Sequence, residues 1–587
     1  MKILGIHYNH NATAALLEDG EIKFCQSEER ISRLKNSVGF PAETVDYIFK
    51  NYGRNIDYVV ISQKSALDYR IIKKQFKFKP VGLESLVGRS KQLRLYTLLR
   101  LFVYKVFNKS FVRFYFIRDW LINHFIDTAP LKQEVRSYFA ETLNIAPSKI
   151  VFMDHHTAHA LAPGFNLKNK TLIFTLDGYG DGLCGTVSIY NSGESDVLTQ
   201  TDVSLSLGAF WADIARFLGM KPVEDEYKVM GLAPYARRNE AERIRDEFKK
   251  VLWLDKNNEF KSAFQTYLAR FFYFDKFLYE RFDNLAGGIQ MFTEEIVTAW
   301  IEGWIKKTGI KNIALSGGIF MNVKLNQKIA EMDGVEEIFV MPSAGDESTV
   351  FGACLFGYKK YCEENKLPFK PQPFHNLYLG QYFTDDEIKK YINDNKISDK
   401  HKVEFYDNIE KKIAELLANN DIVARFKGAM EFGARALGNR SILAHPSHYD
   451  NVRTINRMIK SRDFWMPFAP SILEEDADKY IINPKKVQAP YMAITFNTTE
   501  LGQEHLKAAI HLYDNTTRPQ VVSKEHNSDY HRLISEFKKL TGIEAVLNTS
   551  FNLHGEPIVC SPEYAVRTFE NSGLKYLALG NWLIEKH

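Results

Sequence analysis

The sequence contains few cysteines, and their positions exclude two classes of protein. Only five occur among 587 residues, and no two of them form a Cys-x-x-Cys motif. A disulfide-stabilised secreted domain and a zinc ribbon both need closely spaced cysteines. We therefore expect a protein of a reducing compartment, with the cytoplasm as the default.

The sequence also lacks long apolar segments and a large excess of one charge. No run of about twenty apolar residues is free of charged side chains, so we expect no membrane-spanning helix. The first residues, 1–7, form a strand pattern and not the apolar core of a signal peptide. The formal net charge is only +4, which gives no overall reason to expect nucleic acid as a partner. The length predicts two or three domains.

One region differs from the rest in charge. Between about residues 70 and 126, basic side chains alternate with large apolar ones, and acids are scarce. Basic amphipathic helices of this kind can bind an anionic membrane surface, which would make the protein peripheral to a membrane, or bind a partner. The alternative is an insertion that packs on its own domain while its lysines extend into solvent. The sequence leaves both alternatives open, and it leaves open whether the chain forms an oligomer.

A histidine-rich stretch is the strongest candidate for chemistry. If Asp154 caps a helix, His155 and His159 lie on one face, at the spacing that lets two imidazoles share a cation. His156 with His159 would also be sterically possible. Residues 170–177 then predict a buried strand that ends in Asp177 and a glycine turn. Two imidazoles and a carboxylate suit iron, manganese or zinc. The alternative is that these residues only cap and pack local structure.

Two strand–glycine turn–helix units follow later in the chain. The strand Asn312–Ser316 precedes Gly317 and Gly318, and the strand Glu337–Met341 precedes Asp346. This succession resembles the nucleotide clasp of actin-like ATPases. Because Asp346 also follows a strand end, it is the natural fourth metal ligand.

Other elements are predicted from local patterns. We expect an opening hairpin over Lys2–Glu18, with His10 in its turn, and a strand over Tyr58–Ser62. Further along, we expect a compact loop over Glu226–Tyr235, an aromatic surface subdomain over Leu252–Phe282 and a long helix over Leu285–Lys307.

Three prolines between residues 366 and 374 predict a domain boundary near residue 370, which divides the chain into 1–368 and 369–587. Beyond it, a helix over Ile409–Asn419 and a strand over Ile422–Phe426 lead to a glycine-rich loop with Arg435 and Arg440. Guanidinium groups and exposed backbone donors both fit phosphate, so this loop predicts an anion site. The alternative is that these arginines are merely solvated.

With these residues in hand, the chain resembles the nodulation-type O-carbamoyltransferases (the NodU/CmcH family), nearly from end to end. The motifs that carry the resemblance are Asp154-His-His-x-x-His, Lys228-Val-Met-Gly-Leu-Ala-Pro-Tyr, Ser316-Gly-Gly, Met430-Glu-Phe-Gly-x-Arg-Ala-Leu-Gly-Asn-Arg-Ser-Ile-Leu, Pro467-Phe-Ala-Pro-Ser and Leu547-Asn-Thr-Ser-Phe-Asn-x-x-Gly-Glu-Pro-Ile-Val.

The resemblance implies an α/β protein with an N-terminal actin-like (ASKHA) metal domain. It also implies a C-terminal α/β domain that resembles threonylcarbamoyl-adenylate synthase. The implied activity has two steps: carbamoyl phosphate and ATP give carbamoyl-adenylate in the C-terminal domain, and the carbamoyl group then passes to a hydroxyl of a sugar, glycan or natural product. The implied cofactors are Fe²⁺ or another divalent metal, and ATP together with Mg²⁺.

The resemblance also assigns residues by motif position. It implies a metal site, a general base with a nearby lysine, and a carbamoyl-phosphate and adenylate site with two further phosphate partners. The metal ligands would be His155, His159, Asp177 and Asp346, and the base with its lysine would be His10 and Lys35. The carbamoyl-phosphate and adenylate site would consist of Lys460, Arg518, Asn548 and Ser550, with Arg435 and Arg440 as the further phosphate partners. Gly317 and Gly318 belong to the expected nucleotide clasp.

Two positions depart from the family pattern. The family usually has arginine or tyrosine in place of Met466 and glycine in place of Tyr227. The first departure bears on carbamoyl-phosphate binding, and the second on the shape of the acceptor or nucleotide pocket.

Two other functions stay open on the sequence alone. One is a carbamoyl-type modification of tRNA, which the lack of a strongly basic face outside residues 70–126 disfavours. The other is a non-catalytic adaptor that docks through that basic segment. The sequence does not identify the acceptor.

Overall fold

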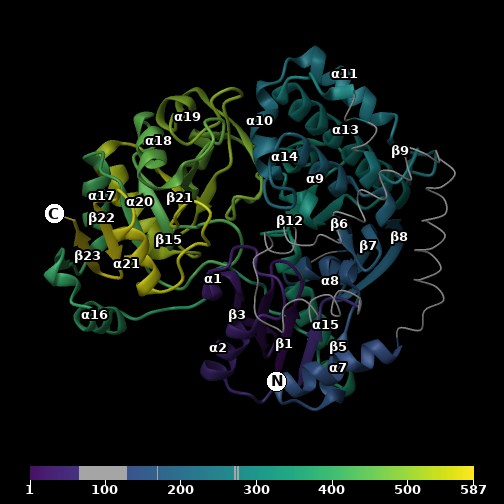
Figure 1. Cartoon of the computed structure of the whole chain (residues 1–587), viewed down its shortest axis with the longest axis horizontal. Coiled ribbons are helices and arrows are strands. Elements are labelled where there is room, and N and C mark those ends of the chain that lie inside the picture. Colours follow the sequence, from purple (N-terminus) through teal and green to yellow (C-terminus); the bar gives the residue numbers. More distant parts are fainter. Residues whose placement is uncertain (65–128, 168–169, 270–272, 274–275, 587) are drawn as a thin grey trace.

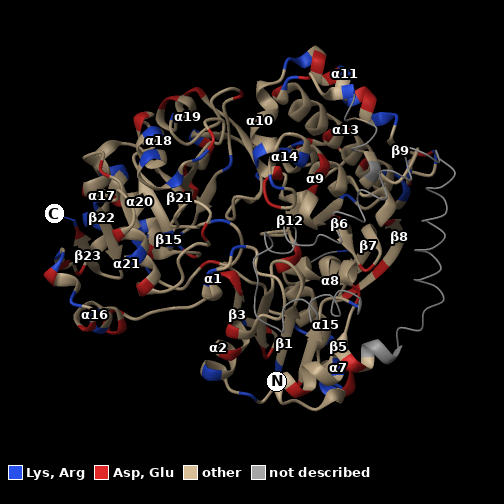
Figure 2. Ribbon diagram, viewed as in Figure 1, with Lys and Arg blue, Asp and Glu red and all other residues tan. Residues whose placement is uncertain are grey.

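The computed structural model describes residues 1–64, 129–167, 170–269, 273 and 276–586 (Figure 1). The basic segment at 70–126 lies outside this part. Among the described residues, no helix is both long enough and apolar enough to cross a membrane. Figure 2 shows both signs of charge interspersed on helices such as α11 (Arg238–Lys249).

Two five-stranded sheets in the first half of the chain share one strand order. In each, three consecutive strands form an antiparallel meander, and two later strands extend the sheet in parallel beside the first strand of the meander. This repeat is the actin-like architecture that the sequence predicts. The first sheet has the order β3 (Glu21–Ser27), β2 (Thr13–Glu18), β1 (Lys2–His7), β4 (Tyr58–Ile61), β5 (Ile150–Phe152), and the second has the order β8 (Glu194–Asp202), β7 (Leu183–Asn191), β6 (Thr171–Gly180), β11 (Asn312–Ser316), β12 (Glu337–Val340).

Helix α15 (Thr349–Glu364) connects the two sheets. It packs on β1 and β4, and it also contacts α8 (His155–Leu161), which lies on β6 and β7. Glycines make these approaches possible: a Cβ on Gly5 would lie 2.6 Å from the carbonyl oxygen of Val350, and one on Gly352 would lie 1.9 Å from that of Ala158. The ends of β1, β6 and β12 therefore come together around α8 and the start of α15.

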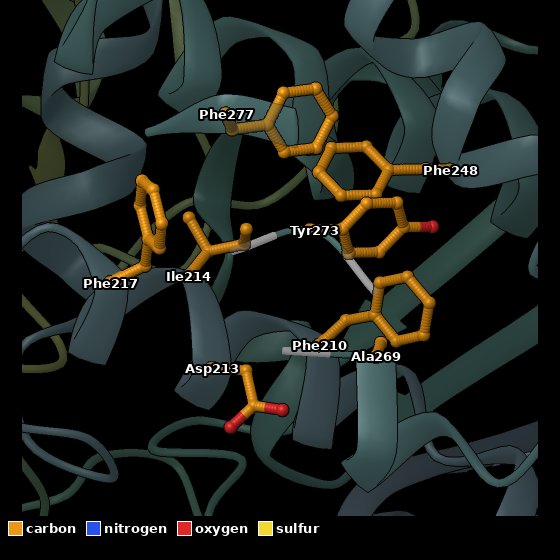
Figure 3. Close-up of a pocket in the computed structure, with 8 residues that line it drawn as sticks. All are labelled: Phe210, Asp213, Ile214, Phe217, Phe248, Ala269, Tyr273 and Phe277. Atoms are coloured by element: carbon orange, nitrogen blue, oxygen red, sulfur yellow. The ribbon is translucent and has the colours of Figure 1, made fainter. Parts of the chain in front are cut away.

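Two local predictions were wrong. Residues 226–232 form a short helix, α10 (Glu226–Leu232), where the sequence predicts a loop. The aromatic stretch after residue 252 is not a surface subdomain, because Tyr273 and Phe277 are buried against Phe210 and Phe248. Figure 3 shows these rings facing one another around an apolar gap, with Asp213 below them. That gap belongs to the core, since its lining is almost entirely apolar.

The predicted long helix and the predicted helix after the first glycine turn are both present, and further helices cover the two sheets. The long helix α13 spans Phe282–Thr308, and α14 (Val323–Glu331) follows the glycine turn after β11. Helix α2 (Ala42–Tyr52) and helix α7 (Ala129–Leu143) accompany the first sheet, and α9 (Leu207–Phe217) packs on β6 of the second.

An eight-stranded mixed sheet forms the core of the second half. Helices α17 (Ile409–Ala418) and α20 (Ser528–Thr541) pack on one face, and α21 (Pro562–Glu570) packs on the other. The strand order is β13 (Lys402–Phe405), β23 (Trp582–Glu585), β22 (Tyr576–Leu579), β14 (Val423–Phe426), β15 (Arg440–Ala444), β21 (Ala545–Ser550), β16 (Ala469–Leu473), β20 (Gln520–Val522).

The two halves of the chain touch through specific contacts. The segment 365–384, between α15 and α16 (Asp385–Asp394), contains neither helix nor strand, and the predicted boundary near residue 370 falls within it. From α1 (Glu29–Ser32), Arg30 donates to the carbonyl oxygen of Gly433 at 2.8 Å, and the following Arg33 donates to that of Ile558 at 2.7 Å. Helix α10 also lies beside the second half (Figure 1), where Trp465 donates to the carbonyl oxygen of Lys228 at 3.1 Å, and Phe351 of α15 packs on Phe432.

Candidate metal centre and anion site

The predicted histidine helix is confirmed. Helix α8 begins after Asp154, whose carboxylate accepts the backbone N–H of Thr157 at 3.0 Å. This cap fixes the first turn. His155 and His159 consequently share one face, and their ring centroids lie 4.7 Å apart. Both imidazoles are buried.

Two carboxylates meet this pair of histidines. Asp177 follows the last regular pair of β6, and Asp346 begins the turn after β12. The Nε2 atom of His159 lies 3.3 Å from an oxygen of Asp177 and 3.5 Å from an oxygen of Asp346. The Nε2 atom of His155 lies 3.6 Å from each carboxylate. One ligand atom from each of the four residues falls within 4.8 Å of all the others.

The cluster fits a divalent metal by the state of its buried atoms. The Nε2 atoms of His155 and His159 and Oδ2 of Asp177 are buried, and none has a hydrogen-bond partner of proper geometry. Unpaired buried polar atoms are costly, so three that converge fit a site for a cation. Two imidazoles with two carboxylates suit iron, manganese or zinc.

Electrostatics within the cluster point the same way. Burial lowers the pKa of His155, but the carboxylates of Asp346 and Asp177 outweigh it and raise the pKa to about 9. The site therefore attracts positive charge, which a metal ion supplies in place of a proton. The Nδ1 atom of His159 lies 3.1 Å from Ser316 Oγ, a contact that holds the ring in orientation.

The alternative pairing through His156 is not formed. This ring is buried, and its Nδ1 atom lies 2.9 Å from Thr175 Oγ1, outside the four-residue cluster. Burial lowers the pKa of His156 to about 3, so the ring is neutral. It serves the packing of α8 against β6.

The residues expected at the acceptor side lie at the margin of the cluster. His10 is 29% exposed, and its Nδ1 atom lies 3.2 Å from Asp346 Oδ2. Lys35 is more exposed, and its Nζ atom lies 4.0 Å from Glu224 Oε2. The structure therefore brings His10 to the metal cluster, while Lys35 lies against Glu224.

The glycine turn after β11 lies directly against Asp177. Gly317 has φ +101°, and a Cβ there would lie 2.5 Å from the carbonyl oxygen of Leu176. A Cβ on Gly318 would lie 2.9 Å from Asp177 Oδ1. Only glycine allows this approach. The turn thus helps to position Asp177, and its expected contact with nucleotide stays a prediction.

A second group of functional side chains lies in the C-terminal half. Lys460 ends a short helical turn (Asn456–Lys460) and is buried; its Nζ donates to Ser550 Oγ at 3.1 Å and to Asn552 Oδ1 at 2.7 Å. Burial, together with the charge of Arg462, holds the pKa of Lys460 well below its usual range. An anion beside Lys460 would restore the charged form.

Three arginines accompany Lys460. Burial and the charges of Arg435 and Arg462 hold the pKa of Arg518 well below its usual range, and burial with Arg462 lowers that of Arg435 to about 10. No carboxylate of the described residues forms a salt bridge with any of these arginines or with Lys460. Four neighbouring basic side chains that form no salt bridge with a described carboxylate have the chemistry of an anion site. We call Arg435, Lys460, Arg462 and Arg518 the cation cluster; the sequence prediction omits Arg462, although it stands only two residues after Lys460.

The remaining predicted residues divide into two groups. Asn548, on β21, donates to Ser471 Oγ at 3.1 Å, and its Oδ1 atom is buried without a partner. Ser550, on the same strand, contacts Lys460. Arg440 is different. It is fully buried, its guanidinium donates to the carbonyl oxygens of Lys427, Asn439 and Gln381, and it stacks on a ring 3.7 Å away. These bonds use its two terminal nitrogens, while Nε is buried without a partner, and the expected contact with phosphate stays a prediction.

The two departures from the family pattern lie where the halves of the chain meet. Tyr227, on α10, interacts electrostatically with Arg435 and Arg462. The sulfur of Met466 packs closely on Gly231, also on α10, since a Cβ on that glycine would lie 2.8 Å from it. Helix α10 therefore covers one side of the cation cluster.

Comparison with known proteins agrees with this division. The family model described as carbamoyltransferase N-terminus matches residues 2–355, and the model described as carbamoyltransferase C-terminus matches residues 414–586. The chain is 33% identical to an uncharacterized protein of Methanocaldococcus jannaschii, over 100% of this chain and 99% of that protein. It is 30% identical to the nodulation protein NolNO of Sinorhizobium fredii, over 99% of this chain and 79% of that protein.

Similarity to solved structures is weak. Full-length HypF in its phosphate- and nucleotide-bound form aligns with a TM-score of 0.37 and 12% identity, over 62% of this chain and 56% of that one. The ROK hexokinase of Thermus thermophilus aligns with a TM-score of 0.28 and 12% identity, over 62% of this chain and 100% of that one. These likenesses carry no argument about function.

Proposed function

This chain belongs to the carbamoyltransferase family, and from its two sites we propose that it activates a carbamoyl group with ATP at the cation cluster and transfers it to a hydroxyl group beside the metal cluster. The observation that carries the proposal is the cation cluster itself. Four basic side chains that form no salt bridge with a described carboxylate fit a polyanion, and carbamoyl phosphate and ATP are both polyanions.

The first step would take place at the cation cluster. Water replaces phosphate on the carbamoyl group, which gives carbamate and inorganic phosphate. A carbamate oxygen then attacks the α-phosphorus of ATP, and pyrophosphate leaves, accompanied by Mg²⁺. Arg435, Arg462 and Arg518 would hold the phosphates in line and neutralise the charge that develops on them. Lys460 lies beside Ser550, where it can hold the adenylate.

The second step would take place at the metal cluster. The oxygen of the acceptor hydroxyl attacks the carbamoyl carbon, and AMP leaves. A base near neutral pH must accept the hydroxyl proton, and His10 is partly exposed beside Asp346, where it can reach an acceptor. His155, His159, Asp177 and Asp346 would hold Fe²⁺ or another divalent metal, which polarises a carbonyl or phosphate oxygen when bound.

The acceptor class follows from the family and not from the geometry. We propose a hydroxyl of a sugar, a glycan or a natural product. This chain departs from the family pattern at Tyr227 and Met466, which lie where the two halves of the chain meet. We therefore expect these two residues to adapt the site to its own acceptor. A role in tRNA modification has no support among the described residues, since charges of both signs are interspersed there (Figure 2).

Pyrophosphate release tests the proposal. The purified protein should release pyrophosphate from ATP only when carbamoyl phosphate is added, and carbamoyl-adenylate should be detectable by mass spectrometry when no acceptor is present. Acetyl phosphate in place of carbamoyl phosphate serves as the matched control. An equal rate of release with and without carbamoyl phosphate would contradict the proposal.

A further inference from the structure

His7 is a buried histidine outside the four-residue metal cluster. It ends β1 and is fully inaccessible to solvent. Its Nδ1 atom lies 3.0 Å from Ser62 Oγ, and its Nε2 atom lies 3.1 Å from the carbonyl oxygen of His10 and 3.6 Å from Asp346 Oδ2. Neither the cation cluster nor the acceptor base accounts for a buried imidazole here.

Hydrogen bonds hold the ring of His7 in place. Its Nδ1 atom faces Ser62 Oγ, which in turn lies 2.8 Å from Thr349 Oγ1 at the start of α15. In the metal-free protein, Nε2 can donate to the carbonyl oxygen of His10. A metal ion would take the place of that proton on Nε2.

The Nε2 atom of His7 also faces the Oδ2 atom of Asp346, at 3.6 Å. The Nδ1 atom of His10 approaches the same Oδ2 atom to 3.2 Å. Three ligand atoms, from His7, His10 and Asp346, thus lie within 4.8 Å of one another. Two imidazole nitrogens and a carboxylate oxygen that converge at this distance form a ligand set for a divalent metal.

We propose that His7, His10 and Asp346 hold a second divalent transition-metal ion, bridged to the first metal centre by the carboxylate of Asp346. Oδ1 of Asp346 faces His155 and His159 at 3.6 and 3.5 Å, while Oδ2 faces His7 and His10 at 3.6 and 3.2 Å. One carboxylate therefore directs one oxygen to each histidine pair.

The separation of the two sites suits a binuclear centre. The rings of His7 and His155 lie 6.1 Å apart between centroids, which places their facing nitrogen atoms around a common space. In known two-metal sites the ions are about 3.5–4 Å apart, and they clamp the attacking and the leaving oxygen. Two imidazoles and one carboxylate select manganese, iron or zinc over magnesium.

This inference goes beyond the proposed function and does not depend on the identity of the substrates. With the second ion bound, Nδ1 of His10 is a ligand, so the ion would take over the role in deprotonation that the proposed function gives to His10. A hydroxyl bound to that ion would then lose its proton more readily, as metal-bound water does. The competing arrangement is a neutral His7 whose Nε2–H donates to the carbonyl oxygen of His10.

Metal titration tests the proposal without any activity assay. The full-length protein, stripped with a chelator, is titrated with Mn²⁺ and followed by electron paramagnetic resonance. We expect about two Mn²⁺ per chain, with the exchange-coupled spectrum of a bridged pair. His7→Ala should bind one ion fewer and lose the coupling, whereas His156→Ala, a buried histidine of neither site, should keep both.

Two results would overturn the proposal. Saturation of the unaltered protein at one Mn²⁺ would assign the space beside His7 to a proton. Retention of two coupled ions in the double variant His7→Ala/His10→Ala would show that the second ion binds elsewhere. Ser62→Ala covers the case in which His7→Ala fails to fold, because it keeps the ring and removes only the hydroxyl that orients it.

The expected effect of Ser62→Ala is specific. Loss of such an orienting partner weakens metal binding by about 10–100-fold. The second ion should therefore bind more weakly in this variant, while the affinity of the first ion stays unchanged. Equal affinities of both ions in the variant and the unaltered protein would contradict the hydrogen-bond chain on which the proposal stands.

Discussion

The backbone N–H of Ala434 donates to the hydroxyl of Ser343 at 3.0 Å, and this hydrogen bond connects the segments that carry the two sites. Ser343 in turn donates to Glu347, which follows the metal-cluster residue Asp346 directly. Ala434 precedes Arg435 of the cation cluster. Glu347 is buried and also interacts electrostatically with Arg435. A few bonds therefore separate the residues assigned to the two steps.

The first prediction concerns the metal content. His159→Ala should lower the divalent metal bound per chain by about one ion, because the two carboxylates and one imidazole that remain bind Fe²⁺ and Zn²⁺ poorly. His156→Ala is the matched control and should keep its metal. Elemental analysis of the purified variants measures both. Undiminished metal in a His155→Ala/His159→Ala double variant would refute the assignment of the first site.

The second prediction concerns pH. The carboxylates that raise the pKa of His155 to about 9 also hold a proton where the metal binds. Below that pH the proton competes with the metal, so affinity should rise from pH 6.5 to about 9 and level off above it. Competition titrations with a chelating dye measure this affinity. A flat profile over the whole range would show that His155 is not a ligand.

The same shift affects the metal-free protein. A raised pKa in the folded state stabilises the fold below the unfolded-state value, near 6.5 for histidine, and this contribution is lost as the pH rises through about 9. The melting temperature of the metal-free protein should therefore fall between pH 6.5 and 9. In the metal-loaded protein the ion replaces the proton, and the decline should be smaller.

The third prediction concerns the glycine turn beside Asp177. Gly317→Ala places a Cβ at φ +101°, against the carbonyl oxygen of Leu176. We expect a loss of about 1–3 kcal/mol in the free energy of unfolding, together with weaker metal binding. Gly334→Ala, at a position without a close neighbour, should change stability by less than about 0.5 kcal/mol. Thermal unfolding of both variants gives the comparison, and equal melting temperatures would contradict the argument.

The fourth prediction concerns the cation cluster. Pyrophosphate should raise the melting temperature of the protein, and Lys460→Met should weaken its binding about tenfold or more, because a charged hydrogen bond to the anion is lost. Lys479 offers a control, since it is already paired with Glu544 at 2.7 Å. Lys479→Met should leave the pyrophosphate-induced shift intact. The opposite ranking of the two variants would place the anion elsewhere.

Local patterns predicted much of the fold, because strands and helices with clear periodicity dominate it. The strand Asn312–Ser316 has the predicted bounds, and the cap at Asp154 placed two histidines on one face. Strand β3 was not predicted, since its apolar positions are interrupted and it pairs only through the meander with β2. Tyr273 and Phe277 were misplaced because an aromatic-rich segment has the same composition on a surface or in a core.

The site was harder to predict where long-range contacts decide. The burial of Arg440 among carbonyl oxygens is not visible in a loop motif, and its contact with phosphate stays a prediction. The sequence prediction did not include His7 among the metal ligands. Its position is set by contacts that join it to Ser62, and Ser62 to Thr349, and these residues are distant in sequence. Such contacts depend on the packing of the two sheets.

The central claim is that activation and transfer occur at two separate sites, and one measurement tests it most directly. Pyrophosphate release from ATP, dependent on carbamoyl phosphate, is compared in Arg518→Ala and His10→Ala. The account predicts that Arg518→Ala abolishes release, because the cation cluster no longer holds the anionic reactants, whereas His10→Ala retains it. Loss of release in His10→Ala together with retention in Arg518→Ala would contradict the account.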